Sequence, residues 1–150
     1  DYFDNRYRFF GIGNYTSVAF ARMKEARRAG IDTFIRMLAN PSIKIVLGTN
    51  ATAGAHGGNV EKLVARVEDG CQDEMTVILS ATSVATESLG LADKVGTIAV
   101  GLWADLLAVG GNPLDDIKHV RNVRFVMKGG QAYQNSVRPV TASAPVPQRR

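Results

Sequence analysis

The sequence predicts an α/β fold, and three observations support this prediction. Residues 43–47 (Ile-Lys-Ile-Val-Leu) are nearly all apolar, as in a strand of a parallel sheet that helices cover on both faces. Helical patterns of apolar residues predominate up to about residue 90. Short apolar segments separated by glycine then follow, up to residue 134, and these are typical of strands. The change of pattern indicates a boundary between two structural parts near residues 90–95.

The first helix is predicted to begin at Val18. Thr16 or Ser17 can cap its first turn, because a hydroxyl oxygen accepts hydrogen bonds from the free amides there. Gly30 loosens the middle of the helix. The helix ends before Pro41, since the residue before a proline avoids the helical conformation. Its basic residues alternate with acidic and apolar ones, which favours a solvated helix face over a surface for nucleic acid.

Three shorter helices are predicted to follow. Asn59 is the expected cap of the first, and Gly70 ends it. The apolar positions of this helix are Val60, Leu63, Val64 and Val67. Asp73 is the expected cap of the second helix, and Ser83 begins the third, which ends at Gly90. The inner face of the second helix is predicted to hold Met75, Ile78 and Leu79.

The last third of the chain is predicted to form strands. They are expected at residues 95–101, 104–109 and 123–128. Gly129-Gly130 can form the turn of a hairpin, from which residues 131–134 return. Residues 136–150 combine prolines with small and polar residues, and we predict a disordered tail there.

Composition limits the class of protein. The chain has 150 residues and a formal net charge of +4, and no stretch approaches the ~20 apolar residues of a membrane span. The single cysteine, Cys71, excludes an intramolecular disulfide and a zinc site built from several cysteines. The first residue is Asp1 and the first methionine is Met23. We therefore expect the sequence to begin partway through a longer protein, or after a removed signal peptide.

Several short motifs follow one another along the chain. They lie at residues 45–50 with 53–57, 81–83 with 89–91, 96–106, 112–117 and 126–130. The first reads Ile-Val-Leu-Gly-Thr-Asn, and the third contains Gly-Thr-Ile-x-x-Gly-x-x-Ala-Asp-Leu. In this order the motifs resemble the C-terminal portion of the metal-dependent amidohydrolase superfamily. The resemblance is closest to its imidazolonepropionase-like and Xaa-Pro or Xaa-Arg dipeptidase branches.

The resemblance implies how the chain is divided. Residues 1–92 would be the C-terminal segment of a (β/α)8 barrel, with 43–47 as its last strand. Residues 93–135 would contribute strands to a small β-sandwich, and 136–150 would be the tail. A whole barrel takes about 250 residues, so this chain can hold only its end. A lone barrel strand leaves its hydrogen-bonding edges uncovered, and a second copy of the chain could cover them.

The resemblance also implies an activity and a cofactor. Family enzymes hydrolyse amide bonds with the help of a divalent metal ion. In the complete enzyme we expect this ion to be zinc. The substrate would be a small amide, a dipeptide or an N-acyl amino acid, with no nucleic acid or membrane as partner. The sequence supplies one of the family's metal-site positions, Asn50, whereas the His-x-His pair and the other ligands have no counterpart, since the only histidines are His56 and His119. The chain alone is therefore expected to bind no metal and to be inactive.

Asn50 is the candidate catalytic residue. In the family, the aspartate that ends the last barrel strand contacts the metal and accepts the proton of the attacking water, and Asn50 stands at its position. An amide is a neutral, weaker metal ligand and cannot act as a base near neutral pH. General-base assistance is worth about 10²–10⁴-fold, so even a complete enzyme with Asn50 would be impaired. The alternative is that Asn50 is a turn residue after a strand.

His56 is the candidate substrate-binding residue, because loops at the ends of barrel strands build the substrate pocket. The alternative is an exposed histidine beside a helix. Asp105 lies between apolar residues on a predicted strand, which favours a structural hydrogen-bonding role. Two functions remain open at this stage. One is an amidohydrolase, and the other is a non-catalytic binding or assembly module derived from one.

Overall fold

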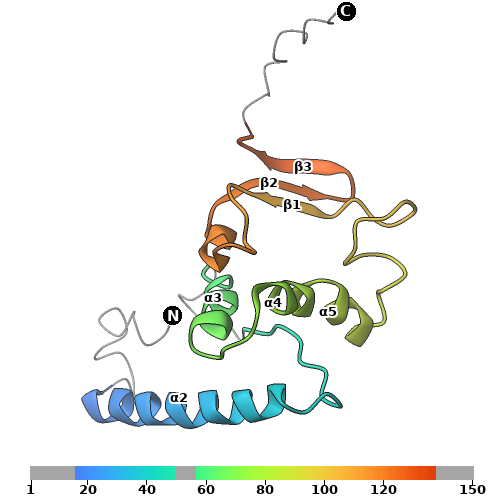
Figure 1. The fold of residues 1–150 in the computed structure, drawn as a ribbon. Helices are drawn as coiled ribbons and strands as arrows, with labels where there is room; N and C mark the ends of the chain where they lie inside the picture. Colours follow the sequence, from blue (N-terminus) through green and yellow to red (C-terminus); the bar gives the residue numbers. More distant parts are fainter. Residues whose placement is uncertain (1–15, 50–56, 138–150) are drawn as a thin grey trace, which may run out of the picture.

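The computed structural model describes residues 16–49 and 57–137, and these form helices followed by a small sheet (Figure 1). The helices are α2 (Ser17–Leu38), α3 (Glu61–Glu68), α4 (Glu74–Ala81) and α5 (Ser83–Ser88). The later elements are β1 (Leu106–Val109), the 3-10 helix η1 (Ile117–Arg121), β2 (Val123–Lys128) and β3 (Gln131–Asn135). Residues 138–150 of the predicted tail lie outside the described residues.

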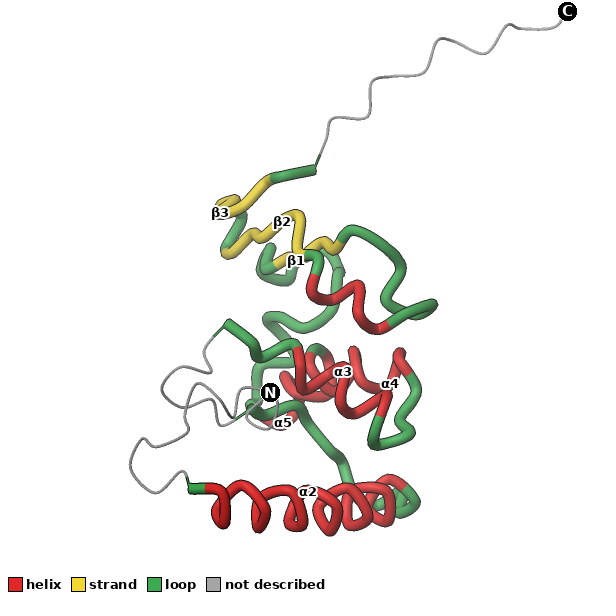
Figure 2. Tube along the Cα trace, turned by 90° about the vertical axis from the view of Figure 1, so that its left-hand side faces the viewer, coloured by secondary structure: helices red, strands yellow, loops and turns green. Residues whose placement is uncertain are grey.

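The described elements form three layers. Helices α3, α4 and α5 lie between the long helix α2 on one side and the sheet on the other, as both views show (Figures 1 and 2). The sheet is antiparallel, with β2 between β1 and β3. Among residues 16–49 and 57–137, no helix combines the length and the apolar character that a membrane span requires.

Helix α2 begins at Ser17, one residue before the predicted Val18, and ends before Pro41 as predicted. The side chain of Thr16 accepts a hydrogen bond from the amide of Ala19 at 3.3 Å, and the helix stops two residues before Asn40. It runs through Gly30 without a break, because one glycine costs a helix only about 1 kcal/mol. No residue of α2 is fully buried.

The core is small and joins both halves of the chain. Its buried members are Leu63, Val64, Val77, Ile117 and Val120. They come from α3, α4 and η1, so the part after residue 93 packs into the same core as the helices before it. This shared core fixes the position of the sheet relative to α3.

Helix α4 presents a different face from the predicted one. Asp73 caps it as expected, accepting from the amide of Thr76 at 2.9 Å. However, Val77 and Ser80 point inward, whereas Met75 is 48% exposed and Leu79 is 40% exposed. Apolar residues occupy both faces of this short helix, so the sequence pattern alone could not choose between them. The prediction that Met75 and Leu79 lie inside is wrong.

The predicted cap of α3 is also wrong. The N-cap of this helix is Val60, and no side chain caps it. Asn59 instead contributes its backbone carbonyl, which accepts from the amide of Lys62 at 3.2 Å. A one-residue shift of the helix start is enough to remove an asparagine from the capping position.

The apolar segment 43–47 is not paired as a strand within the structure. A strand exists only through hydrogen bonds to a neighbouring strand, and among the described residues no strand lies beside it. Ile43 donates to the carbonyl of the nearby Asn40 at 3.1 Å, and the backbone bond to a distant element runs from the amide of Leu47 to the carbonyl of Ser80 at 2.9 Å. The described residues thus form a partial α/β unit, without the other barrel strands.

The C-terminal strands agree with the prediction in part. The β2–β3 hairpin forms as predicted, with Gly129 at φ 56° and Gly130 at φ 81°, the conformation that a two-residue hairpin turn requires. Strand β1 covers the end of the predicted strand at 104–109. Residues 95–101 form turns and bends instead of a strand. Gly96 and Gly101, both at positive φ, bend the chain at the two ends of this segment.

Candidate functional site

The two predicted site residues, Asn50 and His56, lie outside the described residues. The structure describes the chain on both sides of them, up to Thr49 and again from Gly57. The described surroundings of the candidate site are therefore the segment before residue 50, the segment after residue 56, and the residues that hold these two segments.

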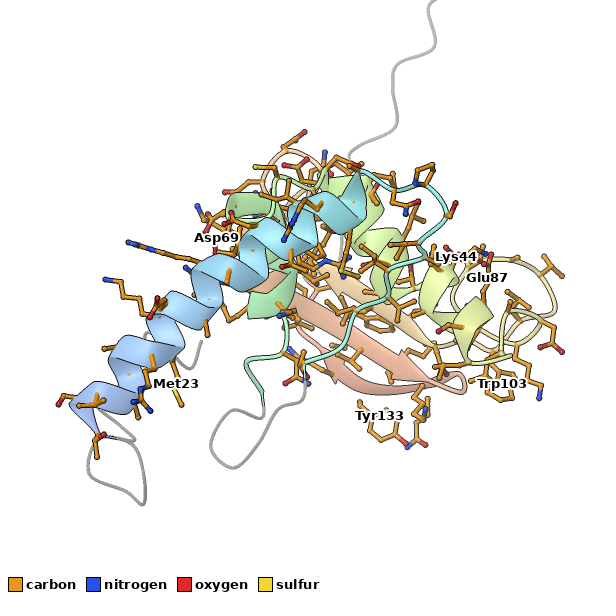
Figure 3. The ribbon with its side chains drawn as sticks, turned by 90° about the horizontal axis from the view of Figure 1, so that it is seen from below. Met23, Lys44, Asp69, Glu87, Trp103 and Tyr133 are labelled. Carbon is orange, nitrogen blue, oxygen red and sulfur yellow. The ribbon has the colours of Figure 1, made fainter. Side chains whose placement is uncertain are left out.

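The segment before residue 50 is held by α4 and α5. The amide of Leu47 donates to the carbonyl of Ser80 at 2.9 Å, and the Leu47 side chain packs against the core. The ammonium of Lys44 donates to Oε2 of Glu87 on α5 at 2.7 Å. These two side chains lie next to each other on one edge of the molecule (Figure 3). These two hydrogen bonds therefore attach the segment before residue 50 to α4 and α5.

The segment after residue 56 is a tight turn into α3. Gly57 has φ 90°, a conformation that side-chain-bearing residues rarely adopt. The carbonyl of Gly58 accepts from the amide of Glu61 at 3.1 Å. The Glu61 carboxylate accepts hydrogen bonds from Nε of Arg121 at 2.7 Å and from Nη2 of Arg121 at 2.6 Å. This pair lowers the pKa of Glu61 through the hydrogen bond from Arg121 and joins the start of α3 to η1.

A buried polar cluster lies behind these segments. Arg66 on α3 is only 5% exposed; its Nε donates to Oε1 of Gln72 at 2.9 Å and its Nη1 to Oγ of Ser80 at 3.0 Å. Nη2 is buried and finds no acceptor among the described residues. The guanidinium lies over the ring of Phe34 on α2, 5.1 Å from its centre. Burial lowers the pKa of Arg66, since a cation is costly to remove from water.

Arg66 is a residue that the sequence analysis did not single out. A signal was available, because Arg66 lies three residues after Leu63 and four before Gly70, on the inward face of α3. A charged residue on an apolar helix face either reaches solvent along its stem or is buried with partners. The sequence contains no indication of which partners these would be, since Gln72 and Ser80 are ordinary polar residues.

The described residues do not supply a metal site. In the part of the chain that the structure describes, no group of three or more histidine, cysteine, aspartate or glutamate side chains could hold an ion. His119 lies in η1, with its ring against the backbone of Gly111. Asp105 has the expected structural role: its Oδ1 accepts from the amide of Gly129 at 2.7 Å, and Oδ2 lies 3.5 Å from the Lys128 ammonium.

Comparison with known proteins identifies the class. The fold is similar to that of a Xaa-Pro dipeptidase with methionine bound in its active site, at 35% identity and a TM-score of 0.71. This match covers 89% of the present chain and 32% of the dipeptidase. A prolidase complexed with N-methylphosphonate-L-proline matches at 26% identity and a TM-score of 0.72, over 89% of this chain and 33% of the prolidase. These neighbours are peptidase-like hydrolases.

A third relative is the ochratoxinase of Aspergillus niger. It is 34% identical over 96 residues, which are 61% of this chain and 20% of the ochratoxinase. Its crystal structure matches at 27% identity and a TM-score of 0.67, over 81% of this chain and 28% of that one. The chain thus spans about a fifth of the curated relative and about a third of the solved structures.

Residues 8–133 match the amidohydrolase family, and the chain belongs to it. The resemblance stated from the sequence motifs is confirmed. Membership implies a TIM-barrel-type fold, of which the described residues show a partial α/β unit with a three-stranded antiparallel sheet. Members of the family generally use a divalent metal ion and act on amide bonds.

Proposed function

We propose that this chain is the C-terminal portion of a metal-dependent amidohydrolase that cleaves amide bonds in dipeptides or N-acyl amino acids. One observation carries the proposal: a family match over residues 8–133 coincides with a fold match of TM-score 0.71 at 35% identity to a Xaa-Pro dipeptidase. The dipeptidase and prolidase neighbours support the dipeptide part of this substrate class. The first part of the chain would close the barrel, and the sheet would belong to a small β-sandwich.

The coverage supports the view that the chain is not the whole enzyme. It corresponds to about a third of its structural neighbours, and a complete barrel takes about 250 residues. We propose that the chain is inactive alone, and that residues beyond those described would hold zinc as the divalent metal. The boundary of the barrel part is proposed near residue 92, although η1 from the later part completes the core of the earlier one.

Asn50 and His56 are the residues we assign to the reaction. The loop that contains them joins Thr49, next to the anchored segment, to Gly57 and α3. We propose that Asn50 occupies the position of the family's proton-accepting aspartate and that His56 contacts the substrate. Because an amide does not accept a proton near neutral pH, the protein with asparagine at position 50 would hydrolyse its substrate slowly.

The proposal is tested on the full-length protein that contains these residues. Its sequence before Asp1 is expected to contain a His-x-His pair on an early strand. The purified protein is incubated with Xaa-Pro dipeptides and N-acetyl amino acids, with and without added zinc and after chelation. Slow release of free amino acid that chelation abolishes is expected. A full-length sequence without the histidine pair would overturn the proposal.

A second candidate function is a non-catalytic binding or assembly module derived from an amidohydrolase. The observation that favours it is the identity of residue 50, an asparagine where the reaction needs a proton acceptor. The two functions differ in one respect that can be measured. An enzyme gains activity when a carboxylate is restored at this position, whereas a module that has lost the rest of its catalytic residues does not.

A further inference from the structure

Arg66 is the most unusual side chain in the described part of the molecule. This cation is only 5% exposed. The two side chains that accept its hydrogen bonds, Gln72 and Ser80, are both neutral. No carboxylate forms a salt bridge with it among residues 16–49 and 57–137. Such a residue costs stability unless its geometry is well satisfied. A leucine or methionine would fill the same position on α3 at lower cost, so stability alone does not explain an arginine.

The contacts of Arg66 form a chain that ends at the candidate site. Nη1 donates to Oγ of Ser80, and that hydroxyl in turn donates to the carbonyl of Val77 at 2.7 Å. The backbone carbonyl of the same Ser80 accepts from the amide of Leu47. Leu47 lies three residues before Asn50. Ser80 is 2% exposed, so these three hydrogen bonds are shielded from water and are sensitive to small displacements of α4.

A second branch fixes the guanidinium itself. Nε donates to Gln72, in the turn between α3 and α4, and the ring of Phe34 from α2 lies against the planar group. Arg66 thus contacts α2, the α3–α4 turn and α4 together. An arginine can do this because its donors lie in one rigid plane that also stacks on an aromatic ring, whereas a lysine offers a single ammonium.

We propose that Arg66 is a positioning residue: through Ser80 it holds the segment that ends at Thr49, directly before Asn50 in the sequence. This inference rests on the proposed function for its catalytic consequence. Its structural part, the connection from Arg66 to Leu47, is independent of any activity. The proposal gives a reason for a buried cation at a place where an apolar residue would fit.

The structural part is tested by amide hydrogen exchange on the full-length protein that contains these residues. Arg66→Met keeps an unbranched apolar stem and removes every side-chain hydrogen bond of this residue. We expect the peptide covering residues 43–49 to exchange about tenfold faster or more, the effect of losing a hydrogen bond to a charged group. Arg66→Lys keeps the charge but lacks the planar guanidinium. Its exchange at residues 43–49 is expected to lie between that of the parent and that of Arg66→Met.

Arg121→Met is the matched control, because Arg121 pairs with Glu61 at the surface and has no link to Leu47. It is expected to leave exchange at residues 43–49 within about twofold of the parent, the scale of surface substitutions. Equal acceleration in both methionine variants would show general destabilisation and overturn the proposal. If Arg66→Met does not fold, Ser80→Ala cuts the same connection with a smaller side chain. Unchanged exchange at residues 43–49 in a folded Ser80→Ala protein would also overturn it.

The catalytic part is tested in the Asn50→Asp background. Adding Arg66→Met is expected to lower kcat about tenfold with KM little changed, since the substrate still binds and the reacting group is misplaced. Faster exchange with an unchanged kcat would refute the positioning role. If no form of the protein hydrolyses amides, the proposed function fails, and the exchange experiment alone then decides whether Arg66 anchors the segment.

Discussion

Gly70 marks the place where α2 approaches α3, and Gly70→Ala tests this packing directly. An added Cβ would lie 2.7 Å from the carbonyl oxygen of Arg66 and 2.7 Å from Cε1 of Phe34. The phenyl ring can rotate or move with α2. The carbonyl cannot move freely, because it accepts from the amide of Gln72 at 3.1 Å and belongs to the last turn of α3.

The magnitude follows from these contacts. Overpacking of this kind costs about 1–3 kcal/mol, and the loss of glycine's freedom in the unfolded chain returns about 0.4–1 kcal/mol. A net loss of about 1–2 kcal/mol is expected. For a domain of this size, that loss corresponds to a fall in Tm of roughly 3–8 °C.

Thermal unfolding followed by far-ultraviolet circular dichroism measures the change, and Gly30→Ala is the matched control. Gly30 lies inside α2, where an added Cβ meets nothing within 4 Å. The same substitution there should raise stability by up to about 1 kcal/mol, because alanine favours a helix interior. A Gly70→Ala protein as stable as the parent would refute the reasoning, since it would mean that α2 does not pack against α3 as described.

Three further predictions are tested by substitution. Asp73→Ala removes the cap of α4 and should lower the free energy of unfolding by about 1 kcal/mol in a urea titration, whereas Asn59→Ala, which removes no capping side chain, should change it by less than about 0.5 kcal/mol. Val77→Ala empties part of the core at a residue with 0% exposure and should cost about 1–3 kcal/mol, with a smaller loss counting against the described core. The pair between Glu61 and Arg121 is partly exposed and should contribute about 0.2–1 kcal/mol. Because the pKa of Glu61 is lowered from 4.5 in the folded protein, this contribution is present above pH 4.5 and is lost as pH falls through the lowered value. The stabilities of the parent and of Arg121→Met should therefore converge on acidification, and a gap that stays constant to low pH would contradict the pairing.

Local signals in the sequence were enough to predict most of the secondary structure. Thr16 and Asp73 cap helices because their side chains can accept from amides in their own first turn. Gly129 and Gly130 form the hairpin turn because both adopt positive φ. Each of these features depends on residues within three or four positions, so no knowledge of the tertiary structure is needed.

Features that depend on distant residues were not predicted. Which face of α4 is buried depends on α3 and η1, and Ile117 and Val120 of η1 lie about forty residues further along the chain. Arg66 is buried because Phe34, Gln72 and Ser80 surround it. No periodicity in the sequence brings these three positions together.

The candidate site was predicted from a family resemblance and not from local patterns. The family is confirmed, whereas the roles of Asn50 and His56 remain predictions because both lie outside the described residues. The segment 43–47 shows why local reasoning has a limit here. Its composition is that of a buried strand, yet a strand forms only when its neighbours are present.

The most direct test of the central claim is the effect of Asn50→Asp on amide hydrolysis by the full-length protein. The parent and the variant are compared at neutral pH with the same Xaa-Pro dipeptide and N-acyl amino acid substrates. A rise in kcat of about 10²–10⁴-fold is expected, the usual contribution of a well-placed general base. No rise in a folded variant would contradict the assignment of residue 50 to the reaction and favour a non-catalytic module.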